Sequence, residues 1–344
     1  ALERQAPGEG REFHQYIAGE WVPAQGDPFT VVQPHDHAAV LGIGRESLQG
    51  DAQAAVAAAA AAAPAWRDMP FDDRAAILLK AADLLSGPWR DRLNAATMLG
   101  QSKTAIQAEI DAACELIDFW RFNVMFARQI LAEQPISSPG VWNRTDHRPL
   151  EGFVYAVTPF NFTAIAGNLP TAPALMGNTV VWKPAATQQY AASLVMELLI
   201  EAGLPPGVIN MVTGTGVPVS DVTLNDPQLA GIHFTGSTPV FQLLWRTVGE
   251  NIASYRSYPR IVGETYFTVF CVDRLDDFKD PINLVAVNLP EKVKTSGHEK
   301  PVGNSQNSEY RFAINGPSDL PLGPQLVSIR ALGEHRGQIQ EVVI

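Results

Sequence analysis

Cysteine is scarce in this 344-residue chain, which contains only Cys114 and Cys271, far apart in the sequence. Two distant cysteines cannot form the disulfide framework of a small secreted domain, and they do not have the number or spacing of a zinc site. We therefore expect a protein of a reducing compartment without a bound metal. His35 and His37 flank Asp36 in a polar segment, which we interpret as a solvated turn.

Basic residues are also few, because 25 Lys and Arg face 36 Asp and Glu and give a formal net charge of -11. Nucleic acids and anionic membranes favour a basic face, so neither is expected as a partner. No apolar run reaches the roughly 18 residues that a membrane span needs, and no basic-then-apolar leader opens the chain. These features predict a cytoplasmic protein; because the chain starts at Ala1, the mitochondrial matrix is the alternative if a targeting segment was removed.

What is present is a globular composition, with 46% hydrophobic residues and a length that suits about two domains. Residues 12–44 alternate short β-rich pieces with turns, and an Ala-rich helix follows, with Asp51 as its expected N-cap. A second helical pattern from about Lys103 to Phe126 places apolar residues at helical spacing, which predicts a buried stripe. The stripe consists of Ile106, Ile110, Cys114, Ile117, Trp120 and Val124, so Cys114 is expected in the core.

Residues 151–265 show a regular alternation of apolar strand-like runs and helix-like stretches. The expected strands are GFVYAV, NTVVW, VINMV, GIHFTG and RIVG, and the expected helices span 163–176, 189–202, 217–224 and 240–252. Such an alternation implies right-handed crossovers and a parallel sheet that helices cover on both faces. After Thr265 the regular alternation stops, and we expect strands in YFTVFCV and INLVAVNL, followed by a loop over KTSGHEKPVGNSQNSE.

Ligands of such sheets bind beyond the carboxyl ends of the strands. The segments at those ends carry Asn161, Lys183, Ser237 and Glu264. An amide, an ammonium, a hydroxyl at a helix start and a carboxylate suit a phosphate-bearing cofactor next to an oxyanion site. No GxGxxG fingerprint follows a strand, and the strand ends of any parallel sheet are polar, so composition alone leaves a purely structural reading open.

Several long motifs in one order resemble the aldehyde dehydrogenase superfamily over residues 12–265. They are EFHQYIAGEW, TPFNFTAIAGNLPTAPALMGNTVVWKPA, EAGLPPGVINMVTG, IHFTGST and RIVGET. The stretches AEIDAACELIDFWRFN and SYPRIVGET resemble the branch that oxidises L-glutamate γ-semialdehyde, the open form of 1-pyrroline-5-carboxylate, in proline catabolism. The resemblance implies an α/β fold, a Rossmann-like parallel sheet of the aldehyde dehydrogenase type with an N-terminal helical region.

The same resemblance assigns roles to individual residues. Asn161 would donate to the oxyanion formed when a thiolate attacks the aldehyde substrate, and Glu264 would be the general base that activates water. Lys183 would hydrogen-bond the adenine-side ribose of the cofactor. NAD is expected rather than NADP, because no cluster of basic residues follows Lys183 in the sequence. The pyrophosphate would meet a helix start, and the residues implied around it are Thr158, Gly236, Ser237, Thr238, Pro239 and Val240.

The chain departs from the family after Glu264. The family follows this glutamate with a Gly pair and later places its catalytic cysteine in a separate domain, whereas this chain continues TYFTVFCVDRLDDFKD. We interpret Cys271 as a core residue rather than a substitute nucleophile, and His233 as packed rather than catalytic. The expected division is an N-terminal region with a hairpin (1–150), an NAD-binding domain (151–265) and a tail in place of the catalytic domain (266–344).

Three readings stay open. The chain is a dehydrogenase of its branch, or an inactive NAD-binding or interaction protein built on the same fold, or its tail is an artefact such as a frameshift. The family assembles through a hairpin that WNRTDHRPLEG could supply, so a homo-oligomer is possible.

Overall fold

The computed structural model describes residues 11–265, with side chains through Glu264, and beyond them the backbone of seven strands. The chain divides into two compact units, residues 1–265 and 266–344, which are described separately. Among the described residues, no helix combines the length and the apolar character that crossing a membrane requires.

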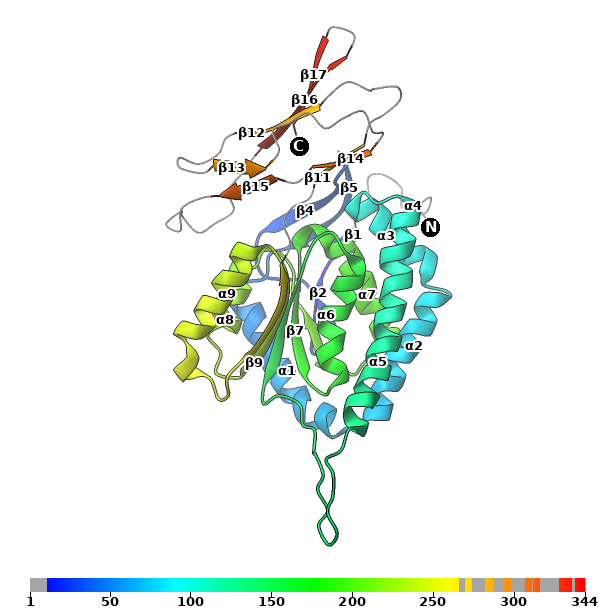
Figure 1. The fold of residues 1–344 in the computed structure, drawn as a ribbon, viewed down its shortest axis with the longest axis vertical. Helices are drawn as coiled ribbons and strands as arrows, with labels where there is room; N and C mark the ends of the chain where they lie inside the picture. The colour runs from blue at the N-terminus through cyan, green and yellow to red at the C-terminus, as the bar shows by residue number, and fades with distance from the viewer. Residues whose placement is uncertain are drawn as a thin grey trace. The chain divides into compact units, whose positions relative to one another are not determined.

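A seven-stranded sheet forms the centre of the first unit (Figure 1), with the strand order β10-β9-β6-β7-β8-β2-β3. The five strands from β6 to β10 are parallel, which confirms the predicted sheet. The antiparallel pair β2 and β3 extends it, through a pairing of Tyr16 with Met211 that the sequence did not indicate. The strand bounds are Gln15–Ile17 (β2), Glu20–Val22 (β3), Phe153–Thr158 (β6), Thr179–Pro184 (β7), Ile209–Met211 (β8), Leu229–Gly236 (β9) and Arg260–Thr265 (β10).

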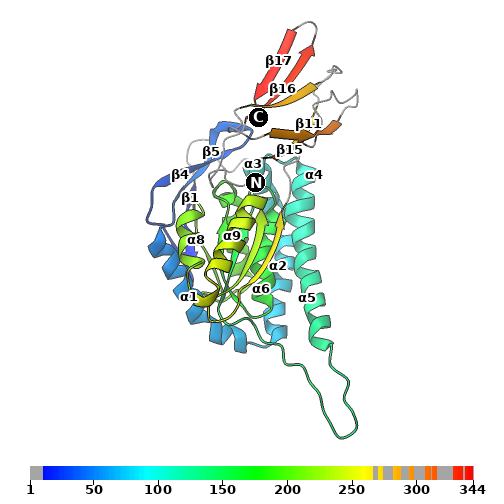
Figure 2. The same ribbon diagram turned by 60° about the vertical axis from the view of Figure 1, so that its left-hand side comes forward.

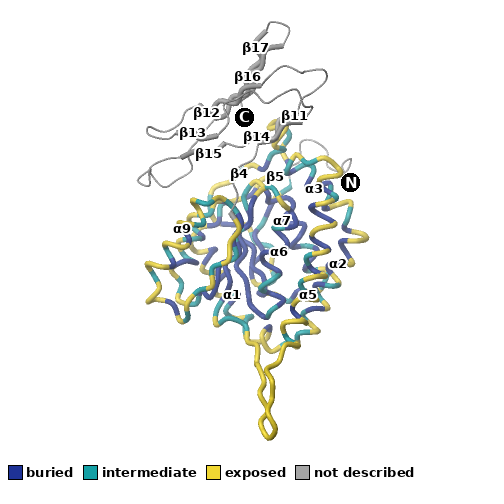
Figure 3. The backbone as a smooth tube through the Cα atoms, viewed as in Figure 1, coloured by how far each residue is buried: buried dark blue, intermediate teal, exposed yellow. Residues whose placement is uncertain are grey.

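Helices cover both faces of the sheet, as Figures 1 and 2 show. Alternate residues of β6 and β7 separate two apolar cores: Val154 and Trp182 pack with one, Tyr155 and Val181 with the other. The first core takes in α2 (Phe71–Ser86), α3 (Arg90–Gln101), α5 (Leu116–Ala132), α6 (Thr163–Leu175) and α7 (Gln189–Glu201). The second takes in α1 (Gln49–Asp68), α8 (Val217–Thr223) and α9 (Thr238–Glu250). Figure 3 shows the buried residues concentrated between these layers.

Three further strands form a small separate sheet in the order β1-β5-β4. Their bounds are Arg11–Phe13 (β1), Pro28–Gln33 (β4) and Asp36–Arg45 (β5), in agreement with the predicted β-rich start. His35 lies in the exposed turn between β4 and β5, where its Nδ1 is 2.7 Å from the Ser102 hydroxyl. His37 is exposed but belongs to β5, so the predicted turn is correct for His35 alone.

The predicted start of the Ala-rich helix is wrong by three residues, because the N-cap is Leu48 rather than Asp51. Helix α1 begins at Gln49, and Asp51 lies inside its first turn, where its carboxylate accepts a hydrogen bond from the Leu48 amide at 2.8 Å. Pro64 lies inside the helix, four residues before its last residue, Asp68.

The predicted apolar stripe is only half correct. Ile117, Trp120 and Val124 are buried, but Ile106, Ile110 and Cys114 are exposed. The reason is that the segment is not one α-helix: α4 (Ala105–Ala108) leads into a π-helical segment, η2 (Glu109–Glu115), before α5 begins. The wider π turn rotates the earlier residues away from the face that continues along α5. Cys114 is therefore not a core residue, contrary to the sequence expectation.

An exposed loop, residues 133–152, connects α5 to β6 and projects from the unit (Figure 3). Its two arms are joined by hydrogen bonds from the Asn143 amide to the Ser137 hydroxyl and from the Thr145 amide to Gln134 Oε1. This loop contains the segment in which the sequence suggested an assembly hairpin.

The second unit contains three small groups of antiparallel strands, β11-β14, β12-β16-β17 and β13-β15. The bounds are Phe270–Asp273 (β11), Ile282–Val287 (β12), Lys294–Gly297 (β13), Asn307–Tyr310 (β14), Phe312–Asn315 (β15), Ser328–His335 (β16) and Gln338–Val343 (β17). The loop expected over KTSGHEKPVGNSQNSE is wrong where β13 and β14 form, because backbone pairing with β15 and β11 outweighs weak local β propensity. Cys271 belongs to β11, and its side chain lies outside the described residues.

Candidate functional site

The parallel strands bring the predicted site residues to one edge of the sheet. Thr158 pairs with Pro184 at the carboxyl ends of β6 and β7, and Glu264 pairs with Thr235 near the ends of β10 and β9. Asn161 follows β6 by three residues, and Ser237 follows β9 directly. The edge therefore carries every candidate that the strand-end argument selected.

Lys183 is the most unusual of these residues because its ammonium lies in the protein interior, with 6% of the residue exposed. Its Nζ donates a 2.7 Å hydrogen bond to the Pro184 carbonyl. Burial lowers the pKa of Lys183 from its ordinary value to about 8, and the negative charge of Glu46 opposes that shift. A buried, sparsely bonded cation at a strand end is suited to donate to an uncharged or anionic ligand group.

Glu46 is a neighbour of this site that the sequence argument missed. Its carboxylate accepts a 2.5 Å hydrogen bond from the Thr215 amide, in the loop between β8 and α8. Gly214 has a φ of +85°, and a Cβ on it would lie 2.2 Å from Glu46 Oε2. Only glycine fits there, so Glu46 and residues 213–216 hold each other in place although they are far apart in the chain.

The start of α9 leaves backbone donors available at the same edge. Its N-cap, Ser237, makes no side-chain capping hydrogen bond, and the first turn contains Pro239 and no acidic residue. The first-turn N–H groups of an uncapped helix have no partner within the helix and attract anions. The surrounding Ser237, Pro239 and Val240 are exposed, so a ligand can reach them.

The segment that carries Asn161 is held from a distance by Asp111. The Asp111 carboxylate accepts hydrogen bonds from the Thr163 amide at 3.0 Å and the Ala164 amide at 2.9 Å. It therefore caps α6, whose own N-cap residue, Phe162, supplies no side-chain cap. Asp111 lies in η2, and the π-helical turn that disrupts the apolar stripe belongs to the same segment that carries this carboxylate.

Lys103 pairs with the Asp111 carboxylate that caps α6. Its Nζ is 2.6 Å from Asp111 Oδ2 and lies 4.2 Å from the centre of the Phe162 ring. The Thr163 hydroxyl is bonded to Thr97 and to Gln101 Nε2. The backbone directly after Asn161 is thus fixed by a buried ion pair and by hydroxyl bonds that no local sequence pattern signals.

The other predicted residues have simpler surroundings. The Thr158 hydroxyl accepts a 3.0 Å hydrogen bond from Trp182 Nε1, so it is engaged inside the sheet. Glu264 is exposed in β10. His233 Nδ1 is 2.9 Å from the Leu169 carbonyl, and burial lowers the pKa of His233, which suits a packed neutral side chain.

The buried ammonium leads to a prediction about stability. The folded-state pKa of Lys183, about 8, is below its ordinary value of 10.5, so the unfolded chain binds more protons between these pH values and its contribution to stability rises with pH there. Replacing Lys183 by Met should remove this rise and stabilise the protein at neutral pH by roughly 3 kcal/mol. Chemical unfolding at several pH values, with the exposed Lys80→Met as control, measures both effects. Parallel pH profiles of the parent chain and Lys183→Met would contradict the prediction.

Comparison with known proteins agrees with the family resemblance that the sequence motifs indicated. The model of the aldehyde dehydrogenase family matches residues 21–257. The chain is 54% identical over 233 residues to delta-1-pyrroline-5-carboxylate dehydrogenase of Agaricus bisporus, which covers 67% of this chain and 42% of the relative. The human mitochondrial protein of that name is 53% identical over 210 residues, covering 61% of this chain and 37% of the relative.

Solved structures agree with these relatives. The crystal structure of the Mycobacterium tuberculosis Delta-pyrroline-5-carboxylate dehydrogenase bound with NAD is 64% identical, with a TM-score of 0.74, and the match covers 75% of this chain and 48% of that one. This chain therefore spans less than half the length of each of these three relatives. The resemblance to the pyrroline-5-carboxylate branch is confirmed, and the chain belongs to the aldehyde dehydrogenase family.

Proposed function

We propose that this chain carries the cofactor-binding part of an enzyme that oxidises L-glutamate γ-semialdehyde to L-glutamate with NAD, in proline catabolism. The observation that supports it best is that the buried Lys183 ammonium and the uncapped start of α9 lie at the same edge of the sheet. Asn161 lies at this edge as well, three residues after β6. The similarity to an NAD-bound pyrroline-5-carboxylate dehydrogenase supports the choice of cofactor and substrate.

The residues at this edge fit NAD. The open N–H groups at the start of α9 suit a pyrophosphate, and the buried Lys183 ammonium suits a ribose hydroxyl. When bound, NAD supplies the acceptor for the hydride of the aldehyde. The N–H groups around Gly236, Ser237 and Thr238 would orient the cofactor, and Thr158 would line the cleft from β6.

Two side chains would serve the aldehyde. The Asn161 amide would donate to the oxygen that becomes negative when a nucleophile adds to the carbonyl. Glu264 would accept a proton from the water that releases the acyl group. Both roles require that a nucleophile has already added to the carbonyl. In the family this nucleophile is a cysteine, and the sequence of this chain has no match to the motif that contains it.

The alternative is an inactive NAD-binding or interaction protein on the same fold. We keep it because Cys114 lies on η2, where its Sγ is 3.8 Å from both Arg90 Nη2 and Glu109 Oε1, and not at a strand end of the site. The side chain of Cys271 lies outside the described residues. A nucleotide-binding assay and a turnover assay together separate the two functions.

The remaining proposals concern partners and location. We place a homo-oligomer contact on the exposed loop 133–152, where Ile136 and Trp142 present apolar side chains. No nucleic acid or membrane partner is proposed for so acidic a chain. The cytoplasm is the proposed location, with the mitochondrial matrix as the alternative, because several relatives are named as mitochondrial.

The proposed domain division follows the chain in three parts. The N-terminal region (1–150) and the NAD-binding domain (151–265) come first, and the tail (266–344) takes the place in the sequence where the family has its catalytic domain.

NAD binding can be tested without any turnover. Millimolar NAD should raise the melting temperature of the chain, because a ligand that binds only the folded state stabilises it. Lys183→Ala should weaken NAD binding by roughly 1 to 3 kcal/mol, measured by calorimetry, because a charge-assisted hydrogen bond is lost.

The exposed Lys80→Ala is the matched control and should bind NAD like the parent chain. A folded parent chain that shows neither heat of binding nor a thermal shift would overturn the proposed cofactor site. Equal losses in Lys80→Ala and Lys183→Ala would remove Lys183 from it.

A further inference from the structure

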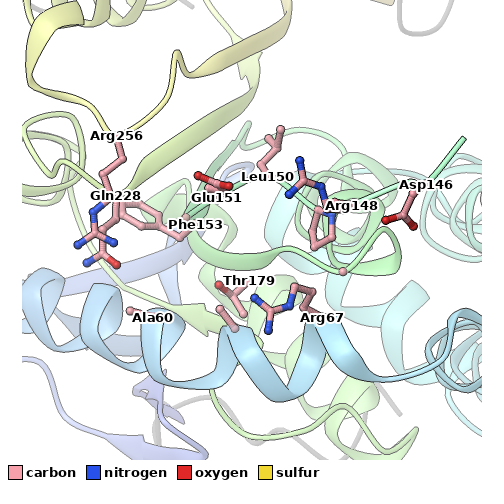
Figure 4. Close-up of a pocket in the computed structure, with 14 residues that line it drawn as sticks. Ala60, Arg67, Asp146, Arg148, Leu150, Glu151, Phe153, Thr179, Gln228 and Arg256 are labelled. Carbon is pink, nitrogen blue, oxygen red and sulfur yellow. The ribbon is translucent and has the colours of Figure 1, made fainter.

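A cavity of about 760 Å³ lies at the edge of the sheet opposite the candidate cofactor site (Figure 4). Its floor contains Phe153 and Thr179, the first residues of the paired strands β6 and β7. Thr158 and Lys183 lie at the other ends of those strands, roughly 15 Å away at the rise of a β-strand. The walls come from α1, the base of loop 133–152 and Arg256. The cavity is therefore distinct from the cofactor edge.

Cationic side chains gather in this cavity although the whole chain has a net charge of -11. Arg67, Arg148 and Arg256 line it, against the carboxylates of Asp146 and Glu151. In Figure 4, Arg67 lies beside Thr179, Arg148 lies near Leu150, and Arg256 lies beside Gln228 at the other end of the cavity.

A neighbouring cavity of about 430 Å³ shares two of these arginines. Arg67 and Arg148 line both cavities, and the second adds Arg74 and His147 and no carboxylate. Arg74 is engaged with backbone carbonyls, among them Leu175 at 3.0 Å. The positive charge of the two cavities is thus centred on Arg67 and Arg148, and no acidic residue is among those that line the second cavity.

Several polar groups here lack protein partners. Within the part of the chain that the structure describes, neither Arg148 nor Arg256 makes a side-chain hydrogen bond or salt bridge, and Arg67 pairs only with the exposed Asp68. The Thr179 hydroxyl is the strongest indication of a ligand, because the residue is 1% exposed and its Oγ1 has no hydrogen-bond partner. A buried hydroxyl without a partner is costly and rare in folded proteins, and a bound ligand is one way to satisfy it.

We propose that this cavity binds a small multivalent anion with phosphate or carboxylate oxygens, between Arg67 and Arg148 and above Thr179. Guanidinium groups pair with such oxygens in a planar, bidentate manner, and two of them suit a dianion better than chloride. The Thr179 hydroxyl donates to the same ligand. Because the site lies at the base of loop 133–152, the ligand fixes that base to α1 and to the start of β7.

Isothermal calorimetry on the full chain tests this site, with inorganic phosphate and malonate as separate probes at constant ionic strength. At least one probe should bind, and NAD should not displace it. Arg148→Gln should weaken binding about tenfold, the loss of one charge-assisted hydrogen bond. Thr179→Val should weaken it too, without lowering the stability of the anion-free protein, because that hydroxyl has no partner to lose. The tighter of the two probes identifies the phosphate or carboxylate class.

The matched control is Arg246→Gln, which removes one exposed arginine from α9, outside both cavities, and should bind like the parent chain. If Arg148→Gln does not fold, Arg67→Gln takes its place with a similar expected loss, because Arg67 is the other guanidinium of the proposed site. Absence of binding at millimolar phosphate and malonate overturns the proposal. Displacement by NAD also overturns it, because it places the anion at the start of α9, and so does an equal loss in Arg246→Gln.

Discussion

Incubation of this chain with NAD and L-glutamate γ-semialdehyde should produce no NADH above the rate without protein. Asn161 stabilises an oxyanion only after a nucleophile has attacked, and Glu264 activates water only against an acyl group on the enzyme. Without covalent attack, the barrier rises on the order of several kcal/mol through lost positioning and lost nucleophilic catalysis. The loss is therefore expected to be complete within the sensitivity of an absorbance assay for NADH.

Two variants make this assay decisive. Cys271→Ser and Glu264→Gln should behave like the parent chain if no turnover occurs. Substantial turnover that Cys271→Ser abolishes would contradict the prediction and would make Cys271 the nucleophile, with the second unit rebuilding the site. Turnover that survives Cys271→Ser but disappears in Glu264→Gln would indicate a mechanism without a thiol.

Replacement of Asp111 by alanine should destabilise the protein by about 3 to 5 kcal/mol, the range for breaking a buried ion pair. The Asp111 and Lys103 side chains are 4% and 15% exposed, so the variant leaves the Lys103 ammonium largely buried without its partner. It also removes the acceptor of the Thr163 and Ala164 amides at the start of α6. Chemical unfolding with fixed NAD concentration measures the free energy of unfolding.

Asp83→Ala is the matched control, because Asp83 forms an exposed pair with Arg121 at 3.2 Å. Exposed pairs contribute about 0 to 1 kcal/mol, so this variant should be nearly neutral. Asp111→Asn should lie between the two, since an amide oxygen still accepts one hydrogen bond. If Asp111→Ala lowers the free energy of unfolding no more than Asp83→Ala does, the Asp111 carboxylate at the start of α6 contributes little to stability.

The parallel sheet of residues 151–265 was predictable because its signals are local. Each strand is a short apolar run between turn residues, and each helix has its own start and length, as β6 to β10 and α6 to α9 confirm. The strand ends then define one edge without further information, since parallel neighbours align their carboxyl ends. Asn161, Lys183, Ser237 and Glu264 could be grouped from the sequence for this reason.

The segment before α5 shows where local periodicity fails. The spacing of Ile106, Ile110 and Cys114 satisfies an α-helical repeat, but the backbone takes a π-helical turn that rotates them into solvent. Periodicity assumes a constant number of residues per turn, and the packing that favours a wider turn is not written in the spacing. The same segment delivers Asp111 to α6.

The sequence alone determined the family, the order of the central elements and the residues at the strand ends, because these depend on local patterns and on several long motifs. The tertiary structure alone decided what surrounds them: the Asp111 carboxylate on α6, Glu46 against Gly214, the addition of β2 and β3 to the sheet, and the arginines of the opposite cavity. Each of these contacts joins residues far apart in the chain. Pairings of this kind are selected by packing and charge in the folded state, and no pattern within a short window carries them.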